Sequence, residues 1–281
     1  MKALVIAPQP FFTPRGTPFS VYYRTMIMSQ LGVEIDLVTY GEGEDINLPN
    51  VNIIRIPRFK IFGHVKLGPS FLKLFLDFFL FFKAFRMLRK NKYDFLHAHE
   101  EAVFMSLIYK KLFNFKLIYD VHSSLPQQLT NFQFTESKTL VKIFEKLEIS
   151  SFRSASVLIT ICPDLYDYVN SKISDNEKLF LVENSIFESV QLKKQDSDKD
   201  IDGDKVSRSI LEKINGNKLI VYAGTLETYQ GIDILVESFK IVVNDVPEAI
   251  LVVVGGTRVQ VEKFRKLADE NGLNDKIIFT G

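Results

Sequence analysis

The sequence predicts an α/β protein built from two doubly wound parallel-sheet domains, the second of them incomplete. Short apolar runs alternate with helical patterns along the chain, and continuous apolar strands between helices are typical of parallel sheets covered on both faces. The length of 281 residues is near the limit for a single hydrophobic core. A polar run, KKQDSDKDIDGDK at 193–205, separates two such series of strands and helices.

The first series opens with a buried strand at Ala3–Ala7. A helix follows at Thr17–Leu31, with Thr17 as its N-cap and Pro18 in its first turn. Further strands are predicted at Glu34–Thr39, Val51–Ile56, Phe95–Ala98, Lys116–Asp120, Val157–Ile161 and Leu179–Val182. Further helices are predicted at 70–89, Ala102–Leu112, Leu140–Ser151 and Asp164–Val169. We assign residues 1–185 to one domain.

The second series is shorter. Its predicted strands are Leu219–Ala223, Ala249–Val254 and Ile277–Thr280, and its predicted helices are Ile232–Val243 and Val259–Asn271. A doubly wound nucleotide-binding domain normally has about six strands, and this series has half as many. We therefore assign 218–281 to a partial second domain and 186–217 to a linker or charged insertion.

Composition excludes several classes of protein. The net charge of +1 gives no general attraction to nucleic acid. A single cysteine, Cys162, rules out an internal disulfide framework and fits a reducing compartment. The first apolar run ends at Pro8, too early for the core of a signal peptide. We expect a cytoplasmic protein.

Residues 60–92 are rich in phenylalanine and contain several lysines and arginines. Charges at Lys73, Asp77 and Lys83 interrupt the apolar run, so it cannot span a bilayer. A helix that is apolar nearly all round is usually buried, and we favour core packing with a basic tip. The alternative is peripheral contact with the inner face of a membrane through 60–92.

Polar stretches follow several strands, where open α/β sheets place their ligands. In TPRGTPFS (13–20), Gly16 allows close approach to a ligand, and the helix that starts at Thr17 favours an anion. The alternative is an ordinary strand-to-helix turn. In HAHEEA (97–102), the two histidines can point the same way, but a metal would need a third ligand, and structural polar residues are favoured.

Two more polar stretches lie further along. In YDVHSSLPQQ (119–128), His122 can hydrogen-bond a ligand hydroxyl or move a proton, unless it only caps the loop. In LFLVENSIF (179–187), Glu183 and Asn184 follow a predicted strand, just before the chain is expected to cross from the first domain to the second.

The strand at Leu219–Ala223 ends at Gly224, and a polar loop then leads to Gly231 and a helix. This order directs backbone N–H groups and the positive end of a helix dipole at one point, which suits a phosphate. A dinucleotide-dependent oxidoreductase is disfavoured, because no G-x-G-x-x-G follows either first strand.

Taken in order, five motifs of the chain resemble those of the family-4 retaining glycosyltransferases. They are the glycine turn after the first strand, H-A-H-E, D-x-H-S, V-x-N-S and YAGTLETYQGIDIL. The resemblance covers the whole chain and implies the GT-B fold, with two Rossmann-like domains. It implies a metal-independent, retaining hexosyl transfer from a nucleotide sugar to a glycan or lipid-linked acceptor. No cofactor and no nucleic acid are expected.

The same resemblance assigns roles to residues. His122 would contact the sugar or acceptor near the reacting centre. The donor would be bound by Gly16, Thr17, Gly224, Thr225, Gln230 and Gly231. Acceptor or interdomain positions would be Arg15, His99, Glu100, Ser123 and Asn184.

The chain departs from the family pattern in two ways. Thr225 and Gln230 stand where many members carry an Arg and a Lys that clamp the diphosphate, leaving Arg15 and Arg258 as candidate substitutes. The family's donor-binding pair of glutamates would lie beyond Gly281, so this chain is expected to be inactive by itself. The alternative function is a non-catalytic subunit that binds a nucleotide sugar or a glycan. The sequence encoded after Gly281 would separate the two.

Overall fold

The computed structural model describes residues 1–13, 16–59, 63–65, 70–131, 137–183 and 214–281. The chain divides into two compact units, Met1–Phe187 and Glu188–Gly281. Most of the predicted linker at 186–217 lies outside the described residues. Each unit is an α/β body with a parallel sheet, in agreement with the predicted fold class.

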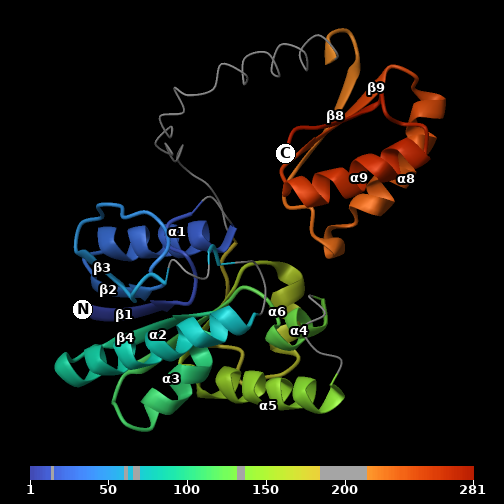
Figure 1. Ribbon diagram of the computed structural model, residues 1–281. Coiled ribbons are helices and arrows are strands. Elements are labelled where there is room, and N and C mark those ends of the chain that lie inside the picture. Colours follow the sequence, from blue (N-terminus) through green and yellow to red (C-terminus); the bar gives the residue numbers. More distant parts are fainter. Residues whose placement is uncertain (14–15, 60–62, 66–69, 132–136, 184–213) are drawn as a thin grey trace. The chain divides into compact units, whose positions relative to one another are not determined.

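The first unit is built on one parallel sheet (Figure 1). In the described residues the sheet has seven strands, in the order β3-β2-β1-β4-β5-β6-β7. Their bounds are β1 Lys2–Ala7, β2 Glu34–Thr39, β3 Val51–Arg55, β4 Phe95–His99, β5 Lys116–Val121, β6 Val157–Thr160 and β7 Leu179–Leu181. The helices are α1 Gly16–Gln30, α2 Phe71–Lys90, α3 Ala102–Lys110, α4 Leu125–Asn131, α5 Lys138–Ser154 and α6 Pro163–Asn170.

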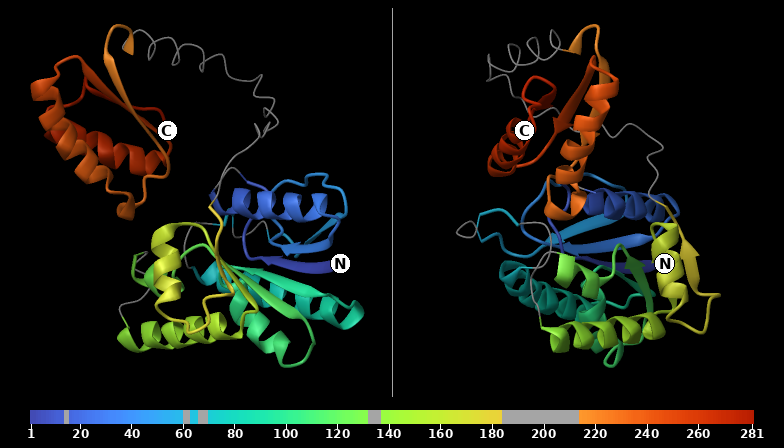
Figure 2. Two further views of the ribbon diagram at one scale, coloured as in Figure 1. Left: turned by 180° about the vertical axis from the view of Figure 1, so that it is seen from behind. Right: turned by 90° about the vertical axis from the view of Figure 1, so that its right-hand side faces the viewer.

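The direction of the connections places the helices. From β1 the chain moves towards β2 and β3, and from β4 it moves the opposite way, towards β7. Because such crossovers are right-handed, α1 lies on one face of the sheet, and α2, α3 and α5 lie on the other (Figures 1 and 2). Helix α4, in the segment LPQQLTN, is absent from the prediction because it is short and has no clear apolar period.

The core of the first unit lies between the sheet and the layer of α2, α3 and α5. Leu4, Ile6, Leu96 and Leu117 from the central strands are completely buried, and Leu80 of α2 is buried with them. No helix in the described residues combines the length and apolarity needed to cross a bilayer.

The second unit has three parallel strands among its described residues, in the order β10-β9-β8. The elements are β8 Lys218–Ala223, a 3₁₀ turn at Thr228–Gln230, α8 Ile232–Asp245, β9 Ala249–Val254, α9 Arg258–Glu270 and β10 Ile277–Phe279. Val236, Phe239, Leu251 and Phe264 form its core. At the edge of the sheet, β8 exposes apolar side chains, and Val221 is 57% accessible.

Candidate active site

The carboxyl ends of β1, β4 and β5 meet at one edge of the first sheet, because these strands are adjacent and parallel. The sheet reverses its direction of growth between β1 and β4, which is where open α/β sheets bind their ligands. Helix α1 begins there at Gly16, β4 ends there at His99, and His122 follows β5 directly.

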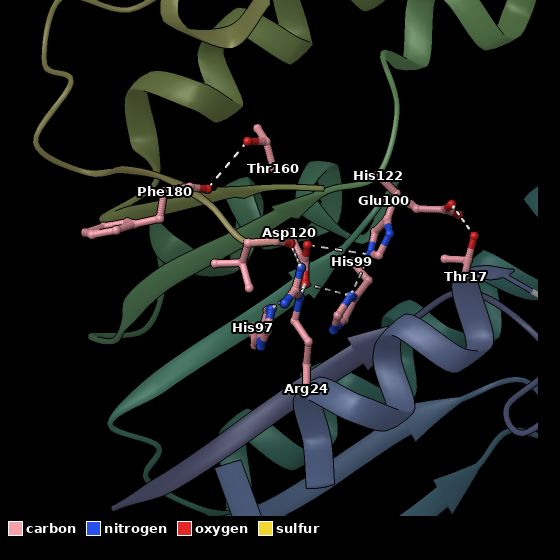
Figure 3. Close-up of polar contacts among 10 residues, drawn as sticks. Thr17, Arg24, His97, His99, Glu100, Asp120, His122, Thr160 and Phe180 are labelled. Carbon is pink, nitrogen blue, oxygen red and sulfur yellow. Dashed lines mark hydrogen bonds and ion pairs between the residues drawn. The ribbon is translucent and has the colours of Figure 1, made fainter. Parts of the chain in front are cut away.

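Three histidines and one aspartate form a buried cluster at this edge (Figure 3). The rings of His97 and His99 stack with 4.4 Å between centroids, so the two side chains share one side of β4 as expected from their spacing. His99 Nδ1 lies 3.2 Å from His122 Nε2. Asp120 Oδ2 lies 3.4 Å from His97 Nε2, and Asp120 Oδ1 lies 3.6 Å from His122 Nε2.

Arg24, on α1, ties this cluster to the helix that covers the same face of the sheet. Its Nε donates to Asp120 Oδ2, and its Nη2 donates to the carbonyl of Val182 at 3.0 Å. The side chain of Arg24 is 12% exposed and that of Asp120 is fully buried. A buried ion pair therefore joins α1 to the end of β5.

Burial sets the charges in the cluster. Desolvation lowers the pKa of His99 and of His122 below the ordinary histidine value, which favours neutral rings near pH 7. Burial alone would raise the pKa of Asp120, but His122, His97 and His99 hold it well below its usual range. With His99 and His122 neutral, the charge of Arg24 balances that of Asp120. The arrangement orients a neutral His122 at the edge of the sheet.

The cluster also bears on metal binding. His97, His99 and Asp120 place one ligand atom each within 4.8 Å of one another, which would suit a metal ion. Arg24 already pairs with Asp120, and its positive charge opposes a cation at the same carboxylate. A cation at this carboxylate would therefore compete with Arg24.

A second polar cluster ties the end of β4 to α1 and α2. Thr17 Oγ1 donates to Glu100 Oε1 at 3.4 Å, and Lys73 Nζ lies 2.8 Å from Glu101 Oε1. The Tyr40 hydroxyl donates to Asp77 Oδ1 at 2.6 Å. Burial and the nearby Glu101 raise the pKa of Glu100 to about 7 and that of Asp77 to about 8. Glu100, beside the start of α1, and Asp77, in the second turn of α2, are therefore carboxyls whose pKa lies near neutral pH.

The predicted phosphate loop belongs to the second unit. Gly224 follows β8, and its N–H donates to the carbonyl of Val254 at 3.0 Å. The Tyr222 hydroxyl donates to the carbonyl of Thr225 at 2.7 Å. Gly231 precedes α8 with a φ of 69°, in the left-handed region that favours glycine. Gly224, Thr225 and Gln230 are exposed, so the loop is accessible to a ligand.

The structure brings six of the predicted site residues to one edge of the first sheet: Gly16, Thr17, His99, Glu100, His122 and Ser123. The Ser123 hydroxyl accepts a hydrogen bond from Gln128 of α4. Arg15 and Asn184 lie outside the described residues. Arg258, a candidate phosphate ligand, begins α9 and donates from Nε to Glu262 at 3.0 Å.

Sequence reasoning missed two contributors, Arg24 and Gly255. Arg24 lies in the middle of α1, and no local pattern indicates its pairing with Asp120, which is 96 positions away. Gly255 follows β9 with a φ of 108°, and a Cβ there would lie 2.2 Å from the carbonyl oxygen of Gly224. The Gly-Gly pair after an apolar strand was the available signal for that close approach.

The first unit has a parallel sheet with buried polar groups where its strand order reverses. The second is a parallel α/β unit with a loop bounded by glycines. Together these features define a ligand-binding α/β protein of the doubly wound class. Residues 19–187 match the family described as Glycosyltransferase Family 4, and residues 204–281 match the one described as Glycosyl transferases group 1. The chain belongs to glycosyltransferase family 4.

A curated relative is an uncharacterised glycosyltransferase of Methanocaldococcus jannaschii, 24% identical over 241 residues. The match covers 84% of this chain and 57% of the relative, so the chain spans little more than half of that protein's length.

Solved structures show the same GT-B fold. Sucrose-phosphate synthase from Thermosynechococcus elongatus matches with a TM-score of 0.70 at 18% identity, covering 100% of this chain and 70% of that one. Anabaena HepE in complex with UDP-glucose gives 0.64 at 15% identity, with 100% and 69% covered. WaaG, a glycosyltransferase involved in lipopolysaccharide biosynthesis, gives 0.62 at 13% identity, with 99% and 69% covered.

Proposed function

We propose that the protein to which this chain belongs is a retaining, metal-independent glycosyltransferase of the hexosyltransferase type. It moves a sugar from a nucleotide donor to a glycan or lipid-linked acceptor in the cytoplasm. The observation that carries the proposal is the neutral, buried His122 at the sheet's switch point, oriented by Asp120 and Arg24, in a chain of glycosyltransferase family 4. Anabaena HepE binds UDP-glucose, which supports a nucleotide-sugar donor.

In the proposed reaction, His122 donates or accepts a hydrogen bond to a hydroxyl of the sugar or acceptor near the reacting carbon. A neutral imidazole does this without placing a positive charge next to the oxocarbenium-like centre that forms during transfer. The anionic Asp120, whose Oδ1 lies 3.6 Å from His122 Nε2, favours a proton on that nitrogen and so helps to keep the ring oriented. His99, at 3.2 Å from His122, limits the ring's rotation.

The leaving diphosphate gains negative charge as the glycosidic bond breaks. Fixed N–H groups of the loop between Gly224 and Gly231 are the proposed stabilising groups, because preorganised dipoles lose no energy to reorientation. Thr225 and Gln230 bring no positive charge to this loop, and Asp233 in the first turn of α8 is acidic. The diphosphate would therefore depend on backbone dipoles more than in relatives that carry a cationic clamp.

The same two positions favour a second candidate function. A loop without Arg and Lys can hold a nucleotide sugar weakly through its backbone without promoting departure of the diphosphate. A non-catalytic nucleotide-sugar or glycan-binding subunit would show donor binding with no release of nucleoside diphosphate.

A thermal-shift screen tests the donor proposal. UDP-, GDP- and ADP-sugars are added to the 281-residue chain and to any longer chain that the gene encodes. One nucleotide class should raise the melting temperature, since a ligand at about 100 times its Kd adds about 2.7 kcal/mol of stability. NAD and inorganic phosphate are the controls. No shift with any nucleotide sugar in either chain contradicts the proposal.

A further inference from the structure

Helix α2 has two apolar faces, of which only one is buried. Leu76, Leu80, Ala84 and Leu88 follow one another at intervals of four and pack into the core. Phe78 and Phe82, on the opposite side of the helix, are 59% and 53% exposed. Core packing therefore accounts for one face of this phenylalanine-rich helix and leaves the other facing outward.

The neighbouring helices continue this outward apolar surface. The rings of Phe81 on α2 and Tyr109 on α3 pack with 5.0 Å between centroids, and those of Phe104 on α3 and Phe144 on α5 with 5.7 Å. The three helices therefore form one layer, which the views in Figures 1 and 2 also show. Its other large exposed apolar side chains are Phe71, Leu74, Phe75, Ile108, Ile143 and Leu147, and Leu112 follows just after α3.

The exposed charges of this layer are almost all positive. Arg86, Arg89 and Lys90 lie on α2, and Lys142 and Lys146 lie on α5, all exposed. Within the residues of α2, α3 and α5, the one exposed carboxylate is Glu145. The whole chain carries a net charge of only +1, so this layer is much more basic than the rest of the protein.

Along α2 the apolar and basic residues share one line. Phe78, Phe82, Arg86 and Arg89 recur at intervals of three or four, so they project from the same outer face. A helix with aromatic and basic residues on one face is suited to the boundary between lipid headgroups and acyl chains, where rings insert and cations meet phosphate. A second copy of the chain would bring like charges together, which argues against this face as a dimer interface.

We infer that the outer face of the α2–α3–α5 layer docks on an anionic lipid bilayer. Contact is peripheral. The inference takes up the alternative of membrane contact through 60–92 and extends it to two further helices. It rests on the proposed function only for its consequence, which is that the acceptor is lipid-linked. Docking itself requires neither donor nor acceptor.

Vesicle flotation of the 281-residue chain tests the inference. Vesicles of phosphatidylcholine are compared with vesicles of equal parts phosphatidylcholine and phosphatidylglycerol, at low and high salt. The chain should float with the anionic vesicles and lose most of its binding at high salt. Arg86→Gln with Arg89→Gln should lower the partition coefficient about 30-fold, from about 1 kcal/mol per cation.

The double variant Phe78→Gln with Phe82→Gln tests the apolar contribution and should abolish flotation. Since both rings are exposed, its melting temperature should stay within about two degrees of that of the unaltered chain. The matched control is Ile27→Gln with Leu31→Gln, exposed residues on and after α1, which should float like the unaltered chain.

Three outcomes would overturn the inference. The chain could fail to float with anionic vesicles, it could bind both vesicle types equally at all salt concentrations, or the Phe78/Phe82 variant could float as well as the control. Self-association abolished by that variant, without flotation, would identify a second copy as the occupant instead. A thermal shift with nucleotide sugars is unaffected by each of these results, so failure of docking and failure of the proposed function are separate observations.

Discussion

Burial controls the protonation of the side chains at the carboxyl edge of the first sheet. His99 and His122 are held neutral, while Asp77 and Glu100 are held partly protonated at neutral pH. These two effects have opposite consequences for stability. The buried histidines destabilise the fold as the pH falls below about 6.5, and the buried carboxyls destabilise it as the pH rises.

Asp77 gives the clearest pH prediction. Its pKa rises from 3.8 to about 8 in the folded protein, so the folded state binds more protons between these values and loses stability as the pH rises through them. Asp77→Asn removes this loss and keeps an oxygen for the Tyr40 hydroxyl.

The melting temperature of Asp77→Asn should therefore exceed that of the unaltered chain by an amount that grows from about pH 5 to about pH 8. Differential scanning fluorimetry across this range is the measurement. Asp269→Asn, at an exposed position of α9, is the control and should show no such trend. A constant difference for Asp77→Asn would show that its carboxyl titrates normally.

For single residues, the sequence predicted the position of a side chain only where that position depends on neighbouring residues in the chain. The spacing of His97 and His99 predicted that they share one side of a strand, and they do. The position of His122 directly after a strand predicted its place at the edge of the sheet. Arg24 and Asp120 could not be paired in advance, because their contact depends on how α1 crosses the sheet and not on any repeat in the chain.

At the scale of elements, the loop after β8 depends on its neighbour. Gly255, at the end of β9, approaches the backbone of Gly224 so closely that a Cβ would lie 2.2 Å from the carbonyl oxygen. Two adjacent parallel strands thus place two glycine turns against each other. The shape of the proposed phosphate loop is set in part by residues that follow a different strand.

Gly255→Ala should lower the free energy of unfolding by more than the left-handed backbone alone explains. Gly272→Ala is the matched control, because Gly272 also has a positive φ, 71°, but a Cβ there would have no neighbour within 4 Å. The control should lose about 1–2 kcal/mol and Gly255→Ala clearly more. Urea denaturation of both variants measures the loss in free energy of unfolding. Equal losses would mean that the close approach of Gly255 to Gly224 does not affect stability.

Regular elements were predictable to the extent that their apolar periods are strong. Every predicted strand has a counterpart among β1 to β10, since buried parallel strands are continuous apolar runs. Helix α2 was predicted as a helix, but the period of its sequence could not indicate that one phenylalanine face would remain exposed. Exposure depends on what packs against a helix, and the sequence of the helix does not contain that information.

At the scale of the whole molecule, the two parallel-sheet units agree with the predicted class, and family membership follows from the matches to both halves of the chain. The strand order of the first sheet follows from right-handed crossovers that change direction once. The identity of the donor and acceptor does not follow from fold, because one fold supports many transfer reactions.

We expect His122 to serve a retaining transfer from a nucleotide sugar. NMR of the anomeric proton, recorded during turnover of the donor that stabilises the protein, tests it most directly. The first product should keep the donor's anomeric configuration, and His122→Ala should form it about 100-fold more slowly. An inverted product, or unchanged turnover in His122→Ala, would contradict the account.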